Sequence, residues 1–275
     1  MKKYLERLSL ALDKVNANNK STIIEKYRKR YEFGLESGLS EQEIEEMLGD
    51  PETIAEKYRT EANNFENKRY DKEHNCVIKT VNDNITIKKS KDDKIHVYFE
   101  DCMDNAYDTK KCLKNGIKIE YDKTKYFGLN RKSGGMITVE IPEDRLFYRA
   151  DISTASGDIK IDNLNSSDLE IVTASGDIVC HRLEAEKIKI TTVSGEMFVD
   201  KGYSKNIVLS SVSGDIDFNH ANSNELHVDT ISGDANIKEA TGNYKTSSVT
   251  GEITINGEKC GNVKSYVKGL FKKWA

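Results

Sequence analysis

One short phrase, Ser/Thr-x-Ser/Thr-Gly-Asp/Glu, occurs six times between residues 150 and 257 of this 275-residue chain. The period is 19 residues for four steps and 18 for the last, as its glycines show: Gly157, Gly176, Gly195, Gly214, Gly233 and Gly251. A fixed period of this size is typical of repeats that stack on their neighbours. We therefore expect an architecture of stacked coils.

Four apolar columns appear when the repeats are aligned on their glycines, at seven and five positions before the glycine and at two and four after it. They hold 24 positions, of which only Thr246 is plainly polar. The members are Ala150, Leu169, Ile188, Ile207, Leu226 and Tyr244; Ile152, Ile171, Ile190, Leu209, Val228 and Thr246; Ile159, Ile178, Met197, Ile216, Ala235 and Ile253; and Ile161, Cys180, Val199, Phe218, Ile237 and Ile255. Residues two apart share a face of a strand, so we expect two half-buried strands per coil, joined at a Ser-Gly corner. The pattern predicts a parallel β-solenoid with 19-residue coils over residues 150–261.

The repeat corners are the first candidate functional residues. They are Ser156, Gly157, Ser175, Gly176, Ser194, Gly195, Ser213, Gly214, Ser232, Gly233, Thr250 and Gly251. Glycine suits such a corner because a positive φ or a close approach to a neighbouring coil excludes a β-carbon. The hydroxyls one and three positions before each glycine share the parity of the apolar columns, so we expect both to point inward and to bond the turn backbone. A nucleophile needs a placed base, and no histidine recurs beside these serines, so the hydroxyls are interpreted as structural.

An acidic column follows each glycine. It contains Asp158, Asp177, Glu196, Asp215, Asp234 and Glu252. Calcium takes six to eight oxygens, whereas each coil offers one carboxylate here, and the Gly-Gly-x-Gly-x-Asp repeat of calcium-binding β-rolls does not occur. We expect these carboxylates to face solvent or to accept hydrogen bonds from corner amides. No metal and no cofactor is expected.

Composition and charge argue against nucleic-acid binding, a signal peptide and a membrane span. Charged residues make up 32% of the chain with a net charge of −4, so no basic field indicates direct nucleic-acid binding. Charges interrupt the apolar run at the N-terminus, as they do not in a signal peptide, and no window has the roughly 18 continuous apolar residues of a membrane span. The expected location is the cytoplasm. The five cysteines form no Cys-x-x-Cys pair.

Residues 1–63 have helical periodicity and predict a small bundle of four short helices. Ser40 with Glu43 forms a capping box, and Asp50 followed by Pro51 is a second helix start. Residues 64–75 are polar and aperiodic, which is typical of a linker. Residues 76–149 carry less regular strands, which we interpret as the N-terminal coils and the cap of the solenoid, because terminal repeats must shield the open edge.

The C-terminal segment, residues 262–275, predicts a short amphipathic helix. Its apolar residues recur at helical spacing opposite a basic side, which is typical of helices that lie on anionic membranes. The candidate contact residues are Tyr266, Lys268, Leu270, Phe271, Lys272, Lys273 and Trp274. An apolar face could equally plug the open end of the solenoid, so a cap and a peripheral membrane contact both remain open.

Two parts of the chain resemble known families. The N-terminal motifs are similar to the HAAS domain, a helical signalling module associated with PadR-type regulators. They are Tyr4-Leu5…Leu8…Leu12, Tyr27…Tyr31…Gly34…Gly38-Leu39-Ser40-Glu41 and Leu48-Gly49-Asp50-Pro51…Ala55. The Ser-Gly-Asp-Ile repeats resemble the bacterial toast-rack, or adhesin-type, β-solenoid family over roughly residues 75–260. The resemblance implies an α+β multidomain protein without family catalytic residues, whose partner is a PadR-type regulator or an envelope-stress protein.

The sequence therefore supports three functional hypotheses. The first is a non-enzymatic intracellular signalling or scaffold protein, in which the helical module binds a partner and the solenoid is an interaction surface. It would be cytoplasmic, and it would also be peripheral at the inner face of the membrane if the C-terminal helix contacts lipid instead of capping the solenoid. The second is a cell-surface adhesin, which requires export. The third is an enzyme acting in a cleft of the solenoid, which is the weakest because the acids recur as a ladder and a site is usually a local exception.

Overall fold

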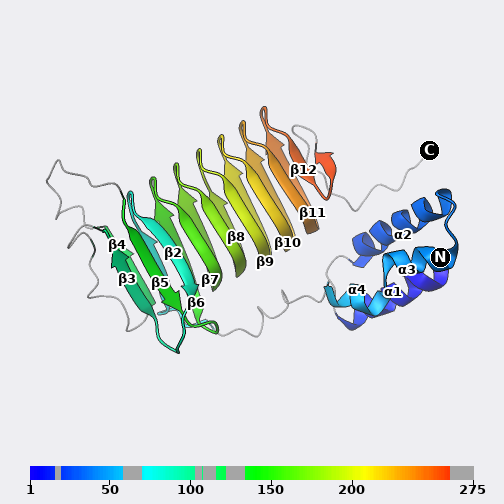
Figure 1. The fold of residues 1–275 in the computed structure, drawn as a ribbon, viewed down its shortest axis with the longest axis horizontal. Coiled ribbons are helices and arrows are strands. Elements are labelled where there is room, and N and C mark those ends of the chain that lie inside the picture. The colour runs from blue at the N-terminus through cyan, green and yellow to red at the C-terminus, as the bar shows by residue number, and fades with distance from the viewer. Residues whose placement is uncertain (16–19, 58–69, 103–106, 108–115, 122–133, 261–275) are drawn as a thin grey trace. The chain divides into compact units, whose positions relative to one another are not determined.

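The computed structural model describes residues 1–15, 20–57, 70–102, 107, 116–121 and 134–260 (Figure 1). The described residues up to 57 and those from 70 onward form two compact units, each with its own hydrophobic core. The predicted C-terminal helix over 262–275 and residues 64–69 of the predicted linker lie outside the described residues. Within the described part of the chain, no helix is long and apolar enough to cross a membrane.

The N-terminal unit is a helical module. It consists of α1 (Lys2–Lys14), α2 (Lys20–Glu36), α3 (Glu41–Leu48) and α4 (Pro51–Lys57). Apolar side chains from the first three helices are fully buried together, among them Tyr4, Leu8, Leu12, Tyr31 and Ile44. A core this small gives only modest stability, so hydrogen bonds that cap the helix ends contribute noticeably to the free energy of unfolding.

Both predicted helix starts are present in the helical module. The Ser40 hydroxyl accepts a hydrogen bond from the Glu43 backbone N–H at 3.3 Å, and the Glu43 carboxylate accepts one from the Ser40 N–H at 2.9 Å. The Glu43 carboxylate also accepts a hydrogen bond from the Ser40 hydroxyl at 2.7 Å, and this bond together with the one from the Ser40 N–H lowers the pKa of Glu43. The Asp50 carboxylate accepts from the Thr53 N–H at 3.0 Å and thereby caps α4, whose first residue is Pro51.

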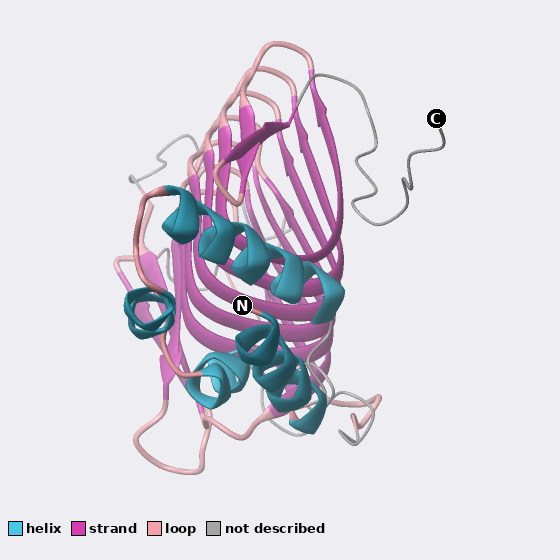
Figure 2. Ribbon diagram, turned by 90° about the vertical axis from the view of Figure 1, so that its right-hand side faces the viewer, coloured by secondary structure: helices cyan, strands magenta, loops and turns pink. Residues whose placement is uncertain are grey.

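The second unit is a parallel β-solenoid, and its coils are nested one behind another (Figure 2). The central strands are β6 (Leu146–Thr154), β7 (Ile159–Thr173), β8 (Ile178–Thr191), β9 (Met197–Ser211), β10 (Ile216–Thr230), β11 (Ala235–Ser248) and β12 (Ile253–Ile255). Consecutive strands pair in parallel with the repeat in register, so that Ile159 lies opposite Ile178 and Ile178 opposite Met197. The 18-residue step is absorbed by an irregularity in the pairing of β10 with β11, between Asn222 and Glu225.

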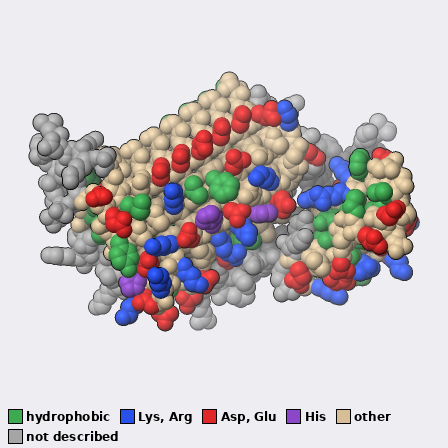
Figure 3. Space-filling model, viewed as in Figure 1, with side chains coloured by type: hydrophobic (Ala, Val, Ile, Leu, Met, Phe, Trp, Pro, Cys, Tyr) green, Lys and Arg blue, Asp and Glu red, His purple; other side chains and the backbone are tan. Residues whose placement is uncertain are grey.

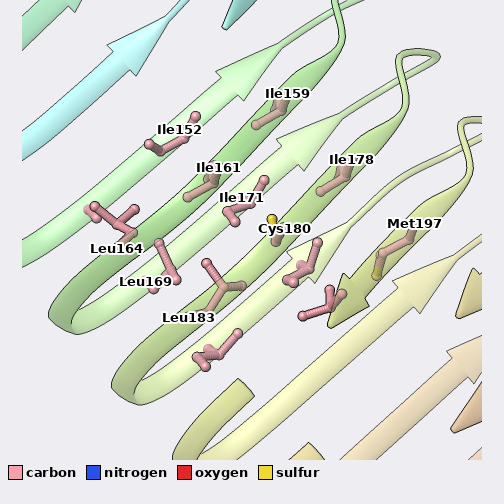
Figure 4. Close-up of a cluster of buried hydrophobic side chains, with 14 of the residues drawn as sticks. Ile152, Ile159, Ile161, Leu164, Leu169, Ile171, Ile178, Cys180, Leu183 and Met197 are labelled. Atoms are coloured by element: carbon pink, nitrogen blue, oxygen red, sulfur yellow. The ribbon is translucent and has the colours of Figure 1, made fainter. Parts of the chain in front are cut away.

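All 24 positions of the four apolar columns are buried, as the pattern predicts. Figure 4 shows how side chains from successive coils, such as Ile159 and Ile178, line up inside the stack. One repeat cannot bury its apolar face alone, whereas stacked repeats share a continuous core. This shared core is the main support of the solenoid.

The shape of each coil differs from the prediction of two strands. Each full coil is one strand of 14 or 15 residues, and in β7 the alternation of buried residues breaks at 162–163 and again at 167–168. The coil therefore bends twice between corners and has three inward-facing segments. The additional inward columns lie seven and nine positions after the glycine; they contain Leu164, Leu183, Gly202, Ala221 and Ala240, and Ser166, Ala185, Ser204 and Ser223.

Residues 75–141 add coils at the N-terminal end, in an order that differs from the chain. β1 (Asn75–Lys79) and β2 (Asn84–Lys89) pair with β6 and β7, and the outer layer is β4 (Gly116–Glu120) and β5 (Met136–Ile141). The layer that comes first in sequence thus lies between the second layer and the regular repeats. β3 (His96–Glu100) pairs antiparallel with β5, and at the other end β13 (Glu258–Cys260) pairs antiparallel with β12. Antiparallel strands thus cover part of both sheet edges, which limits edge-to-edge aggregation.

Candidate functional site

The corner glycines hold neighbouring coils in direct backbone contact. None of the six has a positive φ, and all are buried. A β-carbon on Gly176 would lie 1.8 Å from the carbonyl oxygen of Gly157, and one on Gly195 would lie 1.8 Å from that of Gly176. Real β-carbons do not approach backbone so closely. Close approach to the preceding coil is therefore the reason for glycine at this position.

The hydroxyls three positions before each glycine point inward, as predicted, and stabilise the corner. They belong to Thr154, Thr173, Thr192, Ser211, Thr230 and Ser248, which are all buried. In the first three corners the hydroxyl accepts a hydrogen bond from the glycine N–H at 3.1 Å. In the last three it donates to the glycine carbonyl at 2.5–2.8 Å. Each of these hydroxyls is therefore bonded to the corner backbone.

Thr192→Val is expected to destabilise the solenoid by about 1–2 kcal/mol, because it leaves the buried Gly195 N–H without its acceptor. The measurement is the midpoint of urea unfolding. Ser175→Ala is the control, since the carbonyl of Ala155 keeps its bond from the Ser175 N–H at 3.1 Å. Equal losses in the two variants would contradict the buried role of Thr192.

The hydroxyls one position before each glycine are exposed, and the prediction that they point inward is wrong. The two residues before each glycine both project outward. The alternation of inward and outward side chains along the strand is therefore shifted by one residue at the corner. These hydroxyls still bond from coil to coil: Ser156 donates to the Val81 carbonyl at 3.4 Å, and each of the other five donates to the carbonyl two residues before the preceding glycine at 3.1–3.4 Å. The pairs are Ser175 with Ala155, Ser194 with Ala174, Ser213 with Val193, Ser232 with Val212 and Thr250 with Ile231.

The acidic column forms a row along one face of the solenoid (Figure 3). Its carboxylates accept hydrogen bonds from the backbone N–H of the acid in the next coil, at 2.7–3.0 Å. The observed donors are Asp177, Glu196, Asp234 and Glu252, with Asp158, Asp177, Asp215 and Asp234 as their acceptors. Lys259 pairs with Glu252 at 2.7 Å at the end of the row. Among the described residues, no group of three or more His, Cys, Asp or Glu is placed to hold a metal ion.

Sequence reasoning missed an apolar ridge at the tip of the corners. We use this name for Val193, Val212, Ile231 and Val249, which are 39–67% exposed in four consecutive coils. The backbone carbonyls of Val193, Val212 and Ile231 accept the bonds of the next coil, so the side chains form a regular row beside the exposed hydroxyls. The signal was present two positions before each glycine, where apolar residues recur. A continuous row of this kind fits a macromolecular surface better than a small molecule.

The helical module carries the second candidate surface, which we call the acidic groove. It has a volume of about 520 Å³ and is lined by Tyr4, Arg7, Glu41, Gln42, Glu45, Glu46, Gly49, Asp50 and Pro51. Burial raises the pKa of Tyr4 to about 12, so its hydroxyl stays protonated and donates to the Gly49 carbonyl at 2.7 Å. Arg7 bridges Asp50 and Glu52 at 3.2 Å each. Sequence reasoning did not identify this groove because its walls come from different helices.

The remaining predicted contact residues belong to the C-terminal segment. Tyr266, Lys268, Leu270, Phe271, Lys272, Lys273 and Trp274 lie outside the described residues. The structure therefore joins the six corners into one row and leaves the C-terminal segment as a sequence-based prediction.

Comparison with known families agrees with this division of the chain. Residues 74–265 match the family model described as Toastrack DUF4097, and residues 3–57 match the model described as HAAS. No curated protein and no solved structure matches the chain. Since the first match covers most of the residues, the chain belongs to the Toastrack DUF4097 family and carries an N-terminal HAAS domain.

Proposed function

We propose that the protein is a non-enzymatic signalling or scaffold protein, in which the HAAS domain binds a protein partner and the solenoid is a rigid interaction surface. The partner class is a PadR-type regulator or an envelope-stress membrane protein, as the resemblance implies. The proposed site of action is the cytoplasm, and the C-terminal segment serves either as a cap of the solenoid or as a peripheral contact at the inner face of the membrane.

The observation that carries this proposal is that the hydroxyl and carboxylate groups of the repeat are mostly hydrogen-bonded to the backbone. The buried corner hydroxyls bond the glycine backbone, the exposed hydroxyls bond the preceding coil, and most of the acids bond the next coil. A catalytic site is usually a local exception to the regularity of its scaffold. In the described corners these groups serve the stacking of the coils, which favours a surface role.

Exposed apolar side chains on the HAAS domain support its role as the partner-binding module. Phe33 is 69% exposed, Leu10 63% and Met47 57%. Aromatic residues and methionine are enriched at the cores of protein–protein interfaces, so Phe33 and Met47 are candidate anchors for a partner. Phe33 is the most exposed and serves best as a probe.

Phe33→Asp is expected to weaken partner binding by about 30-fold, because loss of a central apolar anchor costs about 2 kcal/mol. The measurement is co-purification of the full chain with a PadR-type regulator or an envelope-stress protein from the same cells, followed by titration of the pair. Val249→Asp on the ridge, where the side chain is 67% exposed, is the matched control. Loss of binding in the control alone would assign partner binding to the solenoid and contradict the proposal.

A cell-surface adhesin is the second candidate, and the apolar ridge is the observation that favours it. A regular row of apolar and hydroxyl side chains suits contact with an extended polymer. Protease treatment of intact cells distinguishes the two functions. Digestion of the solenoid from outside the cell would favour the adhesin, and full protection would favour the intracellular scaffold.

A further inference from the structure

The apolar ridge presents a continuous line of apolar side chains to solvent. The corners of successive coils project along one edge of the solenoid (Figure 1), and the ridge runs along the last four of them. Backbone hydrogen bonds hold its members in line, because the Val193 carbonyl accepts from the Ser213 N–H and the Val212 carbonyl from the Ser232 N–H, both at 2.8 Å. The spacing of the ridge is therefore set by the stacking of the coils.

That spacing favours a second copy of this chain as the partner. Neighbouring coils are about 4.8 Å apart, so the three steps from Val193 to Val249 span about 14 Å. Side chains on one face of an extended strand recur about every 6.8 Å, and those along one side of a helix about every 5.4 Å, so three steps span about 20 and 16 Å. A second solenoid of the same pitch meets the ridge at every coil, whereas these elements drift out of step.

Charged side chains lie mainly on one side of the ridge. The exposed corner hydroxyls come next to it, followed by the acidic column, which runs along one face of the solenoid (Figure 3). Within the described part of the chain, Glu252 is the only member of this column in an ion pair. On the other side, the outward-facing residues four positions before each glycine include a single acid; they are Thr191, Ser210, Asp229 and Ser247. The surface is therefore asymmetric in charge about the ridge.

This asymmetry favours one of the two orientations in which identical ridges can pack. In an antiparallel pair the two acidic columns face each other, and facing rows of like charge destabilise the contact. In a parallel pair, related by a two-fold axis along the ridge, the columns lie on opposite outer sides. The exposed hydroxyls of each copy then face the row of the other copy that contains Ser210 and Asp229, where hydroxyl–hydroxyl and hydroxyl–carboxylate hydrogen bonds can form.

We infer that the apolar ridge is a homodimer interface, in which two copies of the chain pack ridge against ridge with their coils parallel. Each ridge residue meets its own counterpart, so Val212 contacts Val212 of the second copy and Ile231 contacts Ile231. Each copy contributes four apolar side chains. An interface this narrow is weak, and its Kd is expected to be on the order of 10–100 µM. The inference rests on the proposed role of the solenoid as an interaction surface but not on partner binding by the HAAS domain, so the two can fail separately.

Sedimentation equilibrium of the purified full chain, at concentrations that bracket the expected Kd, measures this dimer. Val212→Asp brings two carboxylates together in the interface and is expected to raise the Kd at least about 30-fold. Val212→Lys is expected to do the same. An equimolar mixture of the two variants should restore the dimer, because residue 212 of one copy meets residue 212 of the other.

Tyr148→Asp is the matched control. Tyr148 lies on the solenoid outside the ridge and is 40% exposed, against 39% for Val212. Its substitution should leave the Kd unchanged. Should Val212→Asp unfold the solenoid, as circular dichroism would show, Val212→Thr replaces it; this variant keeps the shape of the side chain and should still raise the Kd about fivefold.

The inference is wrong if the chain stays monomeric well above the expected Kd, or if Val212→Asp leaves the dimer intact. Equal weakening by Tyr148→Asp would also contradict it. Restoration of the dimer by Val212→Asp with Ile231→Lys in one chain, but not by the mixture, would indicate an antiparallel contact and overturn the parallel pairing. Loss of the dimer in Phe33→Asp, with no effect of Val212→Asp, would assign self-association to the HAAS domain instead.

Discussion

Gly195→Ala is expected to lower the free energy of unfolding of the solenoid by about 3 kcal/mol or more, or to prevent folding. The added β-carbon would lie 1.8 Å from the carbonyl oxygen of Gly176 and 2.5 Å from its carbonyl carbon. These neighbours are backbone atoms, so no rotamer change relieves the overlap. Relief requires separating two coils and breaking hydrogen bonds between them. The measurement is urea unfolding followed by circular dichroism, with the unfolding rate as a second observable.

Ser194→Ala, one residue earlier, is the matched control for this prediction. Its hydroxyl is exposed and makes one bond of 3.2 Å to the Ala174 carbonyl, which also accepts the Ser194 N–H at 3.0 Å. Its loss should cost about 0.5 kcal/mol. If Gly195→Ala were as mild as this control, the coils would not be in contact at their corners.

Phe218→Ala is expected to cost about 3–5 kcal/mol, because the ring is fully buried and its removal leaves a cavity. The ring occupies space that Gly202 leaves free, since a β-carbon on Gly202 would lie 2.4 Å from the Phe218 Cζ. Two earlier coils have Leu164 and Leu183 in the column of Gly202. The small and large residues of adjacent coils therefore compensate in volume.

A double-mutant cycle tests this compensation. Gly202→Leu alone should be destabilising because it overlaps the ring, but in the Phe218→Ala background it should fill the cavity. We expect a favourable coupling of at least about 1 kcal/mol in urea unfolding. Additive effects of the two substitutions would show that Gly202 and Phe218 do not share one space.

The period and the apolar columns were sufficient to predict the regular part of the solenoid. Each of the 24 column positions is occupied by a residue whose burial repeats in every coil, so the signal accumulates over six repeats. The second bend was missed because its inward columns mix Leu, Gly, Ala and Ser, as in Leu183, Gly202 and Ala221. Because small and large residues of neighbouring coils compensate in volume, these columns do not show the same apolar residue type in every repeat.

The N-terminal coils could not be placed from the sequence for a different reason. The corner of the β1–β2 coil runs from Thr80 to Asn84 and has Asp83 where the repeats have glycine, so the recurring phrase is lost. The Asp83 carboxylate accepts a hydrogen bond from the Gly135 N–H at 2.6 Å. The order of these layers depends on pairing between distant segments, which no period in the chain encodes.

The candidate functional surfaces, too, could be predicted from the sequence only in part. The bonding of the corner hydroxyls and acids to the backbone was predictable, because hydroxyls and carboxylates at a tight turn find backbone partners. The outward direction of the Ser194 side chain was not predictable, because two consecutive residues at the tip of the corner, Val193 and Ser194, both face solvent. The acidic groove requires α1 beside α3 and α4, and therefore appears only in the tertiary structure.

The stacking of the corners is most directly tested by distances between spin labels, attached through a bio-orthogonal amino acid and measured by pulsed electron resonance. One label replaces Ala155 and the other replaces Val212, Ile231 or Val249 in turn. These pairs are three, four and five coils apart, so the backbone separations should be about 14, 19 and 24 Å, in equal steps of about 4.8 Å. Distances that did not rise by one strand spacing per coil would contradict the stacked solenoid.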